Sequence, residues 1–163
     1  MQALFAAVVV VAVGGLFYRS DPARSAPAVT VAIALAFGLA AAAPVLVRRL
    51  GLVEVIFLLG LVGVYDASAF LVGTGATRPW EGPVAGVAFM FAVTLAAAAV
   101  FVPPFDGVSP WLLGALAAAT APLGPAAADK LLGDGNARTP AVRRLDSLLV
   151  LGPLWAALAY ALV

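Results

Sequence analysis

The sequence predicts an all-α, polytopic integral membrane protein with about six transmembrane helices in a single domain. Three observations lead to this fold class. Hydrophobic residues make up 64% of the 163 residues, and the mean hydropathy is +1.12. Charged residues make up only 10%, against about 25% in an average soluble domain. Apolar stretches long enough to cross a bilayer also recur along the whole chain.

Six stretches have roughly the 17–25 residues that a membrane-crossing helix needs. They cover residues 2–18, 26–47, 51–73, 83–102, 110–132 and 145–163, and Pro, Gly and charged residues fill the breaks between them. The first stretch has no basic residues before it, so we interpret it as a retained helix rather than a cleaved signal. Pro122, Gly124 and Pro125 interrupt the fifth stretch.

Positive charges are unevenly shared between the predicted loops. Seven of the nine Lys and Arg residues fall on one side of this topology, and only Arg48 and Arg49 fall on the other. The side with more positive charge is expected to face the cytoplasm. We therefore expect a protein of the plasma membrane, most simply of a prokaryote, with both termini outside and its polar loops facing the cytoplasm.

The composition excludes several kinds of chemistry. The chain has no Cys and no His, which excludes disulfides, thiolate chemistry and the commonest side-chain base at neutral pH. A net charge of +1 leaves no basic footprint for nucleic acid. Any reaction has to use carboxylates, Arg, Lys, hydroxyls and backbone groups.

Two short polar segments interrupt the apolar sequence, at residues 65–82 and 129–147. Asp66, in the first, lies about seven residues inside the third span, roughly 10 Å from its end. An acid at that depth requires a polar cavity, a cation or a partner. Asp66 is thus either part of a functional site or one half of a buried pair with Arg78 or Arg144. Glu54 lies roughly 18 Å away along the same helix, where we expect it to meet Arg48 or Arg49 instead.

The other polar residues each allow a chemical and a structural interpretation. Arg78 can hold a phosphate with its planar guanidinium, or it can anchor the helix end at the membrane surface together with Trp80. Asp146 can bind a cation or cap the sixth helix. Three further cations suit either anionic groups or the positive-inside pattern: Lys130, Arg143 and Arg144.

Together, the two segments resemble motifs of the phosphatidate cytidylyltransferase (CDP-diacylglycerol synthase) family. The family stretch D-x-x-A-Y-x-x-G reads Asp66-Ala-Ser-Ala-Phe-Leu-Val-Gly73, and K-T-W-E-G-x-x-G-G reads Arg78-Pro-Trp-Glu-Gly-Pro-Val-Ala-Gly86. The closing D-R-x-D-S-L looks like Arg143-Arg-Leu-Asp-Ser-Leu148. The order and spacing agree, and the match spans most of the region from Tyr65 to the C-terminus, so the chain looks like a short, divergent form of the family's C-terminal part.

The chain departs from the family at several acids. The stretch G-D-L-x-E-S looks like Gly124-Pro-Ala-Ala-Ala-Asp129, without its Asp and Glu unless Asp129 stands in one position later. The stretch P-G-H-G-G has become a region around Arg138-Thr139-Pro140, a tripeptide without His or Gly, and the first Asp of D-R-x-D is Arg143. An Arg can replace a metal ion's charge but cannot bridge phosphates as Mg²⁺ does.

The resemblance implies that CMP is transferred from CTP to the phosphate of phosphatidic acid, with Mg²⁺ as cofactor and release of pyrophosphate. It implies three catalytic residues, namely Asp66, Asp146 and Glu81. The metal would be bound by Asp66, Asp146 and Asp129, and substrate phosphates by Arg78, Lys130, Arg143 and Arg144.

Two other classes of function stay open. The chain can be a catalytically inactive relative that binds lipid or serves as a subunit of a membrane complex. It can also be a small transporter, as the broken fifth helix and the intramembrane acid suggest. A homodimer or a larger membrane complex is expected, because a chain of this size has little surface with which to enclose a site.

Overall fold

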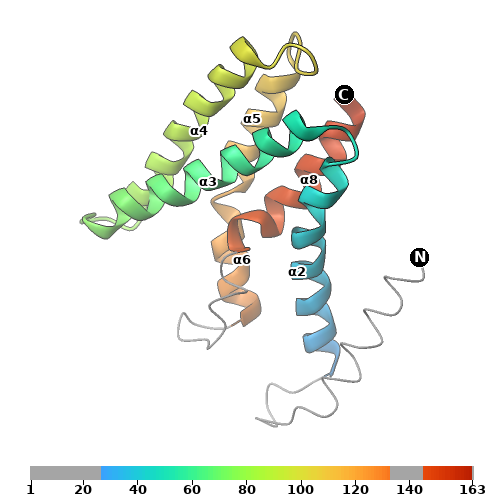
Figure 1. The fold of residues 1–163 in the computed structure, drawn as a ribbon. Helices are drawn as coiled ribbons and strands as arrows, with labels where there is room; N and C mark the ends of the chain where they lie inside the picture. The colour runs from blue at the N-terminus through green and yellow to red at the C-terminus, as the bar shows by residue number, and fades with distance from the viewer. Residues whose placement is uncertain (1–26, 133–144, 163) are drawn as a thin grey trace.

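The computed structural model describes residues 27–132 and 145–162, and all regular structure in these ranges is helical. The elements, drawn in Figure 1, are α2 (Pro27–Val47), α3 (Leu52–Thr74), α4 (Glu81–Val100), α5 (Ser109–Thr120), α6 (Leu123–Leu132) and α8 (Asp146–Leu162). The all-α class is therefore confirmed for this part of the chain. The fifth predicted stretch is divided into α5 and α6 at Ala121–Pro122, since proline cannot continue the hydrogen-bonding pattern of a helix.

Three helical stretches are long and apolar enough to cross a membrane: Leu52–Thr74, Glu81–Val100 and Ser109–Lys130. At 1.5 Å per residue, α3 is roughly 34 Å long, close to the thickness of the hydrocarbon core. The apolar stretches Val31–Val47 and Asp146–Leu162 are shorter. The described residues thus support three spans rather than the predicted six, and the predicted span at 2–18 lies outside them.

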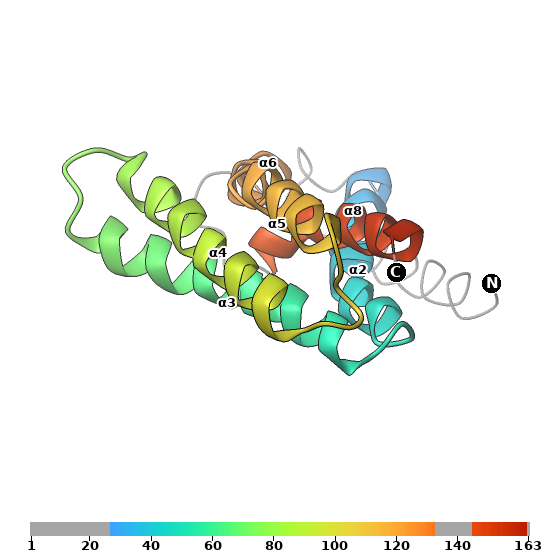
Figure 2. The same cartoon turned by 90° about the horizontal axis from the view of Figure 1, so that it is seen from above.

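Helices α3 and α4 form an antiparallel hairpin that extends to one side of the remaining helices (Figures 1 and 2). Helix α8 packs against α2, α5 and α6, and its first turn reaches α3. In the core, the ring of Phe57 meets Phe105 and Trp155 edge-on, with centroid distances of 4.9 and 5.8 Å. These contacts hold α3, the α4–α5 loop and α8 together.

Small residues let the hairpin helices approach closely. A Cβ added at Gly82 would lie 2.7 Å from the carbonyl oxygen of Ala69, and one at Gly86 would lie 2.5 Å from the ring of Tyr65. Gly82 and Ala69 both belong to the stretches that resemble family motifs. Part of those motifs is therefore explained by helix packing.

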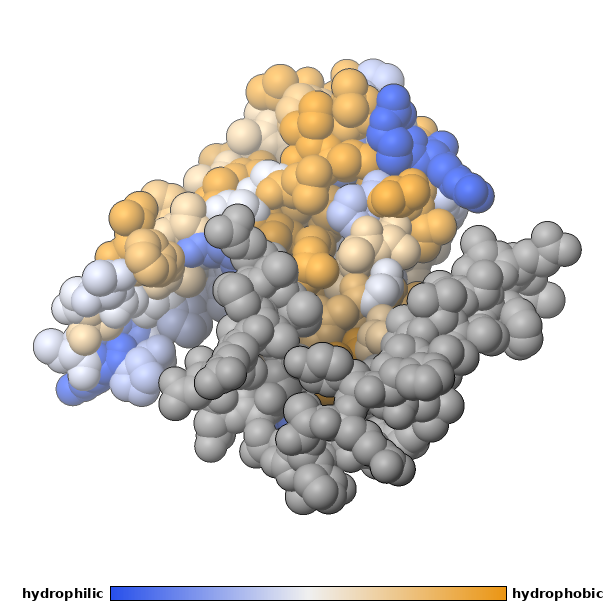
Figure 3. Space-filling model, turned by 60° about the horizontal axis from the view of Figure 1, so that its bottom comes forward, coloured by the Kyte–Doolittle hydropathy of each residue, from blue (hydrophilic) through white to orange (hydrophobic). Residues whose placement is uncertain are grey.

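The surface suits a helical protein with an apolar middle. Figure 3 shows hydrophilic residues gathered at two separated ends of the face in view, with a mostly hydrophobic surface between them. Arg48 and Arg49 are exposed at the α2–α3 turn, and Arg78 is exposed at the opposite end of α3. Between these ends, large apolar side chains such as Phe70 and Leu71 are more than 70% exposed. An exposed apolar band of this kind marks contact with lipid or with other protein.

The prediction that Glu54 pairs with Arg48 or Arg49 is wrong. Glu54 is only 4% exposed, and within the described residues it forms no ion pair with Arg48 or Arg49. Its carboxylate instead folds back over Gly51, where an added Cβ would overlap it. This position lies in the first turn of α3, where the helix dipole favours negative charge.

Candidate functional site

Asp66 and Ser147 join the two polar segments. The hydroxyl of Ser147 donates a hydrogen bond to Oδ1 of Asp66, across 81 positions of sequence. Asp66 is exposed, whereas Ser147 is only 5% exposed. Asp66 lies eight residues before Thr74, the last residue of α3, and so roughly 12 Å from that end of the helix. The site therefore lies inside the apolar part of α3 and is still open on one side.

Asp146, next to Ser147, is the first residue of α8 and is only 9% exposed. A carboxylate in the first turn of a helix is stabilised by the helix dipole. The position agrees with the structural interpretation of Asp146 as a helix-start residue. Asp146 also directly precedes Ser147 in the chain, so the chemical interpretation of Asp146 stays a prediction.

Helix α6 begins directly against this part of α8. A Cβ added at Gly124 would overlap the carbonyl oxygen of Asp146 and lie 3.1 Å from Cα of Ser147. Gly124 is thus the residue that lets α6 approach the backbone of the site. Neither Gly124 nor Ser147 was among the predicted site residues, although both stand in stretches that resemble family motifs.

The hairpin tip, residues 75–80 between α3 and α4, carries a separate polar group. Thr77 donates a hydrogen bond of 3.1 Å to Oε1 of Glu81, the first residue of α4. The guanidinium of Arg78 lies 5.9 Å from the centroid of the Trp80 ring, within reach of a cation–π interaction. Arg78 is therefore held by Trp80 at the tip and does not pair with Asp66.

Glu81 is set apart from Asp66 along the hairpin. Its neighbour Gly82 packs on Gly73: a Cβ added at Gly82 would lie 3.2 Å from Cα of Gly73. Gly73 follows Asp66 by seven residues, which corresponds to roughly 10 Å of helix. The structure thus joins Asp66 to Ser147, the residue that follows Asp146 in the chain, while Glu81 belongs to the tip.

Near the end of α6, Ala128 and Asp129 occupy different surroundings. Ala128, which stands where the family stretch has its Glu, is completely buried, whereas Asp129 is exposed. Successive helix residues point about 100° apart, so the Asp129 side chain does not occupy the buried position of Ala128. Lys130 is also exposed. Arg143 and Arg144 lie outside the described residues.

In the described residues, no three acidic side chains come close enough to form a metal site by themselves. Mg²⁺ is usually held by one or two carboxylates together with substrate phosphates and water. Asp66, which accepts the hydrogen bond from Ser147, provides a hard oxygen ligand of this kind, and Asp146 stands next to Ser147 in the chain. One carboxylate fits a magnesium ion that arrives with a phosphate substrate rather than one fixed by protein ligands alone.

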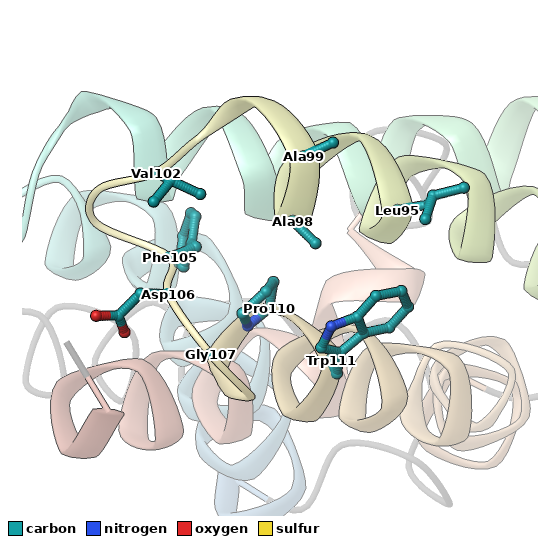
Figure 4. Close-up of a pocket in the computed structure, with 9 residues that line it drawn as sticks. All are labelled: Leu95, Ala98, Ala99, Val102, Phe105, Asp106, Gly107, Pro110 and Trp111. Carbon is teal, nitrogen blue, oxygen red and sulfur yellow. The ribbon is translucent and has the colours of Figure 1, made fainter.

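Two cavities flank the ends of α4. The first, of about 320 Å³, is lined by Trp80, Pro83, Val84, Val87 and Pro122. The second, of about 330 Å³, lies between the C-terminal end of α4, the following loop and the start of α5 (Figure 4). In Figure 4 the carboxylate of Asp106 points away from Trp111, so the charge does not face the ring. The first cavity adjoins the hairpin tip and is the one nearer to the predicted phosphate-binding Arg78.

No protein-family model, curated protein or solved structure matches this chain. The functional argument therefore rests on the residues and their arrangement.

Proposed function

We propose that this protein is a cytidylyltransferase-like membrane enzyme that transfers CMP from CTP to a lipid phosphate such as phosphatidic acid. The observation that carries the proposal is the hydrogen bond between Asp66 and Ser147. It joins the two segments that resemble family motifs, at a depth where an acid requires a functional or structural reason.

In this reaction a phosphate oxygen of the lipid attacks the α-phosphorus of CTP. A new phosphorus–oxygen bond forms, the bond to the β-phosphate breaks, and pyrophosphate leaves with the bonding electrons. The protein's task is to position two anionic substrates and to offset their charge. Asp66 would hold Mg²⁺ together with the substrate phosphates, with Asp146 as the predicted second ligand, and the ion would neutralise phosphate charge.

The cations serve the substrates in this proposal. Arg78 at the hairpin tip would hold a substrate phosphate with its guanidinium, and Lys130 at the end of α6 would add positive charge. Arg143 and Arg144 complete the predicted phosphate-binding set. In this proposal Glu81 serves at the hairpin tip rather than beside Asp66. The hydrogen bond from Thr77 holds the Glu81 carboxylate at the tip.

The proposed topology has six spans, with the hairpin tip and the start of α8 at the cytoplasmic face. CTP is a cytoplasmic substrate. In this orientation, CTP and a lipid of the inner leaflet would both reach the hairpin tip and the start of α8. The positive-inside distribution of Lys and Arg supports the orientation. A homodimer, or assembly with other membrane proteins, would cover part of the exposed apolar surface.

The decisive experiment measures incorporation of labelled CTP into lipid by the purified protein with phosphatidic acid, with and without Mg²⁺. We expect metal-dependent CDP-lipid formation that Asp66→Asn abolishes. Asp106→Asn is the matched control, since Asp106 is an exposed loop acid at the other end of α4 and should retain activity. Unchanged activity in Asp66→Asn would refute the assignment.

A second candidate is a catalytically inactive relative that binds lipid or serves a membrane complex. Its support is the complete burial of Ala128, where packing fills the position of a family acid. Lipid binding without any CDP-lipid product, in protein shown to be folded, would favour this candidate over the first.

A further inference from the structure

We infer that the cavity between Trp80, Val87 and Pro122 is a lipid subsite, which holds one acyl chain of an anionic glycerophospholipid whose phosphate is bound by Arg78. The inference rests on the proposed function in that it names the lipid-binding part of the same site. It can nevertheless be tested by binding alone, without CTP.

The cavity has the composition and the place that an acyl chain requires. Its walls are the apolar side chains at the start of α4, together with Pro122 from the break between α5 and α6. Its volume of about 320 Å³ is at the small end of the range for ligand pockets. Val84 is 55% exposed and Trp80 is 53% exposed, so the cavity is accessible from the surface. This size and openness suit a flexible chain that enters from the side.

Charge at the mouth of the cavity determines which lipid it holds. Trp80 lines the cavity, and the guanidinium of Arg78 lies 5.9 Å from the centroid of the same ring. The Trp80 ring therefore connects an apolar compartment to a fixed positive charge. A phospholipid with a negative phosphate above an apolar chain has the matching arrangement.

The apolar walls supply orientation rather than affinity. A chain that leaves the bilayer for the cavity exchanges one apolar environment for another, so the hydrophobic gain is small. Selection must come from the Arg78–phosphate contact, and the walls decide where the chain lies. The cavity and the predicted reaction site share helix α4 as a neighbour, because Val87 lines the cavity and Gly86 packs on the ring of Tyr65, the residue before Asp66.

Tryptophan fluorescence gives a direct test. The protein with Trp111→Phe keeps Trp80 as its exposed Trp, since Trp155 is completely buried. It is placed in phosphatidylcholine vesicles that contain a small fraction of lipid brominated midway along an acyl chain, either phosphatidic acid or phosphatidylcholine. We expect brominated phosphatidic acid to quench Trp80 at a roughly fivefold lower fraction, the preference that one Arg near the surface provides.

Two variants separate the headgroup contact from the chain contact. Arg78→Gln should abolish the preference for phosphatidic acid. Val87→Phe, which fills the cavity, should weaken quenching by both lipids, whereas Ala88→Phe, an exposed neighbour outside the cavity, should not. Equal quenching by both lipids before any substitution at Arg78 would overturn the inference, as would equal effects of the two Phe variants.

The outcomes distinguish the subsite from the reaction. Selective quenching without CDP-lipid formation would leave the lipid subsite intact and refute the enzyme. CDP-lipid formation that is unaffected by Val87→Phe, with equal quenching by both lipids, would retain the enzyme and refute the subsite.

Discussion

Replacing Gly124 by Ala should destabilise the protein and disrupt the candidate site together. The added Cβ would overlap the carbonyl oxygen of Asp146 and lie 3.1 Å from Cα of Ser147. Both are backbone atoms, so no side chain can rotate away to make room. Separation of α6 from α8 would also move Ser147, whose hydroxyl donates to Asp66.

The size of the effect follows from two opposed terms. Overpacking of this kind costs about 3 kcal/mol at the upper end of its usual range. Replacing Gly by Ala inside a helix returns about 1 kcal/mol. The net loss is about 2 kcal/mol, or roughly a 30-fold shift in the unfolding equilibrium.

Gly63→Ala is the matched control, because a Cβ at Gly63 would meet nothing within 4 Å. The unfolding equilibrium of each variant can be measured in detergent mixtures with increasing fractions of dodecyl sulfate, and CDP-lipid formation can be measured on the same samples. We expect Gly124→Ala to lose stability and activity while Gly63→Ala keeps both. If Gly124→Ala were as stable as Gly63→Ala, the close approach of α6 to α8 would be refuted.

Three further predictions concern other parts of the structure. Ser147→Ala should lower stability by about 1.5–3 kcal/mol through loss of a hydrogen bond to a charged group, measured in the same unfolding assay. An unchanged unfolding midpoint would contradict the hydrogen bond that joins α3 to α8. Glu54→Gln should lower stability by about 0.3–1 kcal/mol, because the favourable interaction of the carboxylate with the helix dipole is lost, but CDP-lipid formation should stay intact. Loss of activity without loss of stability would contradict the separation of Glu54 from the site. Because the chain has no Cys, the single-Cys variants Ala76→Cys and Arg49→Cys can each be labelled with a membrane-impermeant maleimide. The two should react from opposite sides of the membrane. Labelling of both from the same side would refute α3 as a membrane span.

The helical class and the position of the main apolar stretches could be predicted from the sequence because both depend on local properties. Hydropathy identifies segments such as α3 and α4, and Pro122 marks the break between α5 and α6. Lipid and protein interior are both apolar, however, so hydropathy does not indicate which face of such a helix meets its neighbours. The contact of Gly86 with Tyr65 was not predictable for this reason.

The candidate site, too, could be predicted from the sequence only where it depends on local properties and not where it depends on contacts between distant segments. The unusual position of Asp66 is visible in the sequence, since an acid among apolar residues requires an explanation. Its partner Ser147 is 81 positions away, and only the crossing of α3 and α8 brings the two together. Glu54 illustrates the opposite error. Opposite charges at neighbouring positions suggested an ion pair, but the N-terminal end of α3 accommodates the carboxylate instead.

The separation of charges along α3 constrains how the proposed reaction can work. Arg78 lies at the hairpin tip, whereas Asp66 lies roughly 12 Å inside the end of the helix. A single phosphate cannot contact both. In the proposed reaction the tip would hold one phosphate of the substrate pair while another lies deeper, beside Asp66. Two substrates that carry several phosphates between them can span this distance, and a lipid held in the cavity near Trp80 would have its phosphate at Arg78. In the proposed reaction, two phosphate-bearing molecules therefore have to occupy the site together, with one phosphate at Arg78 and another deeper, beside Asp66.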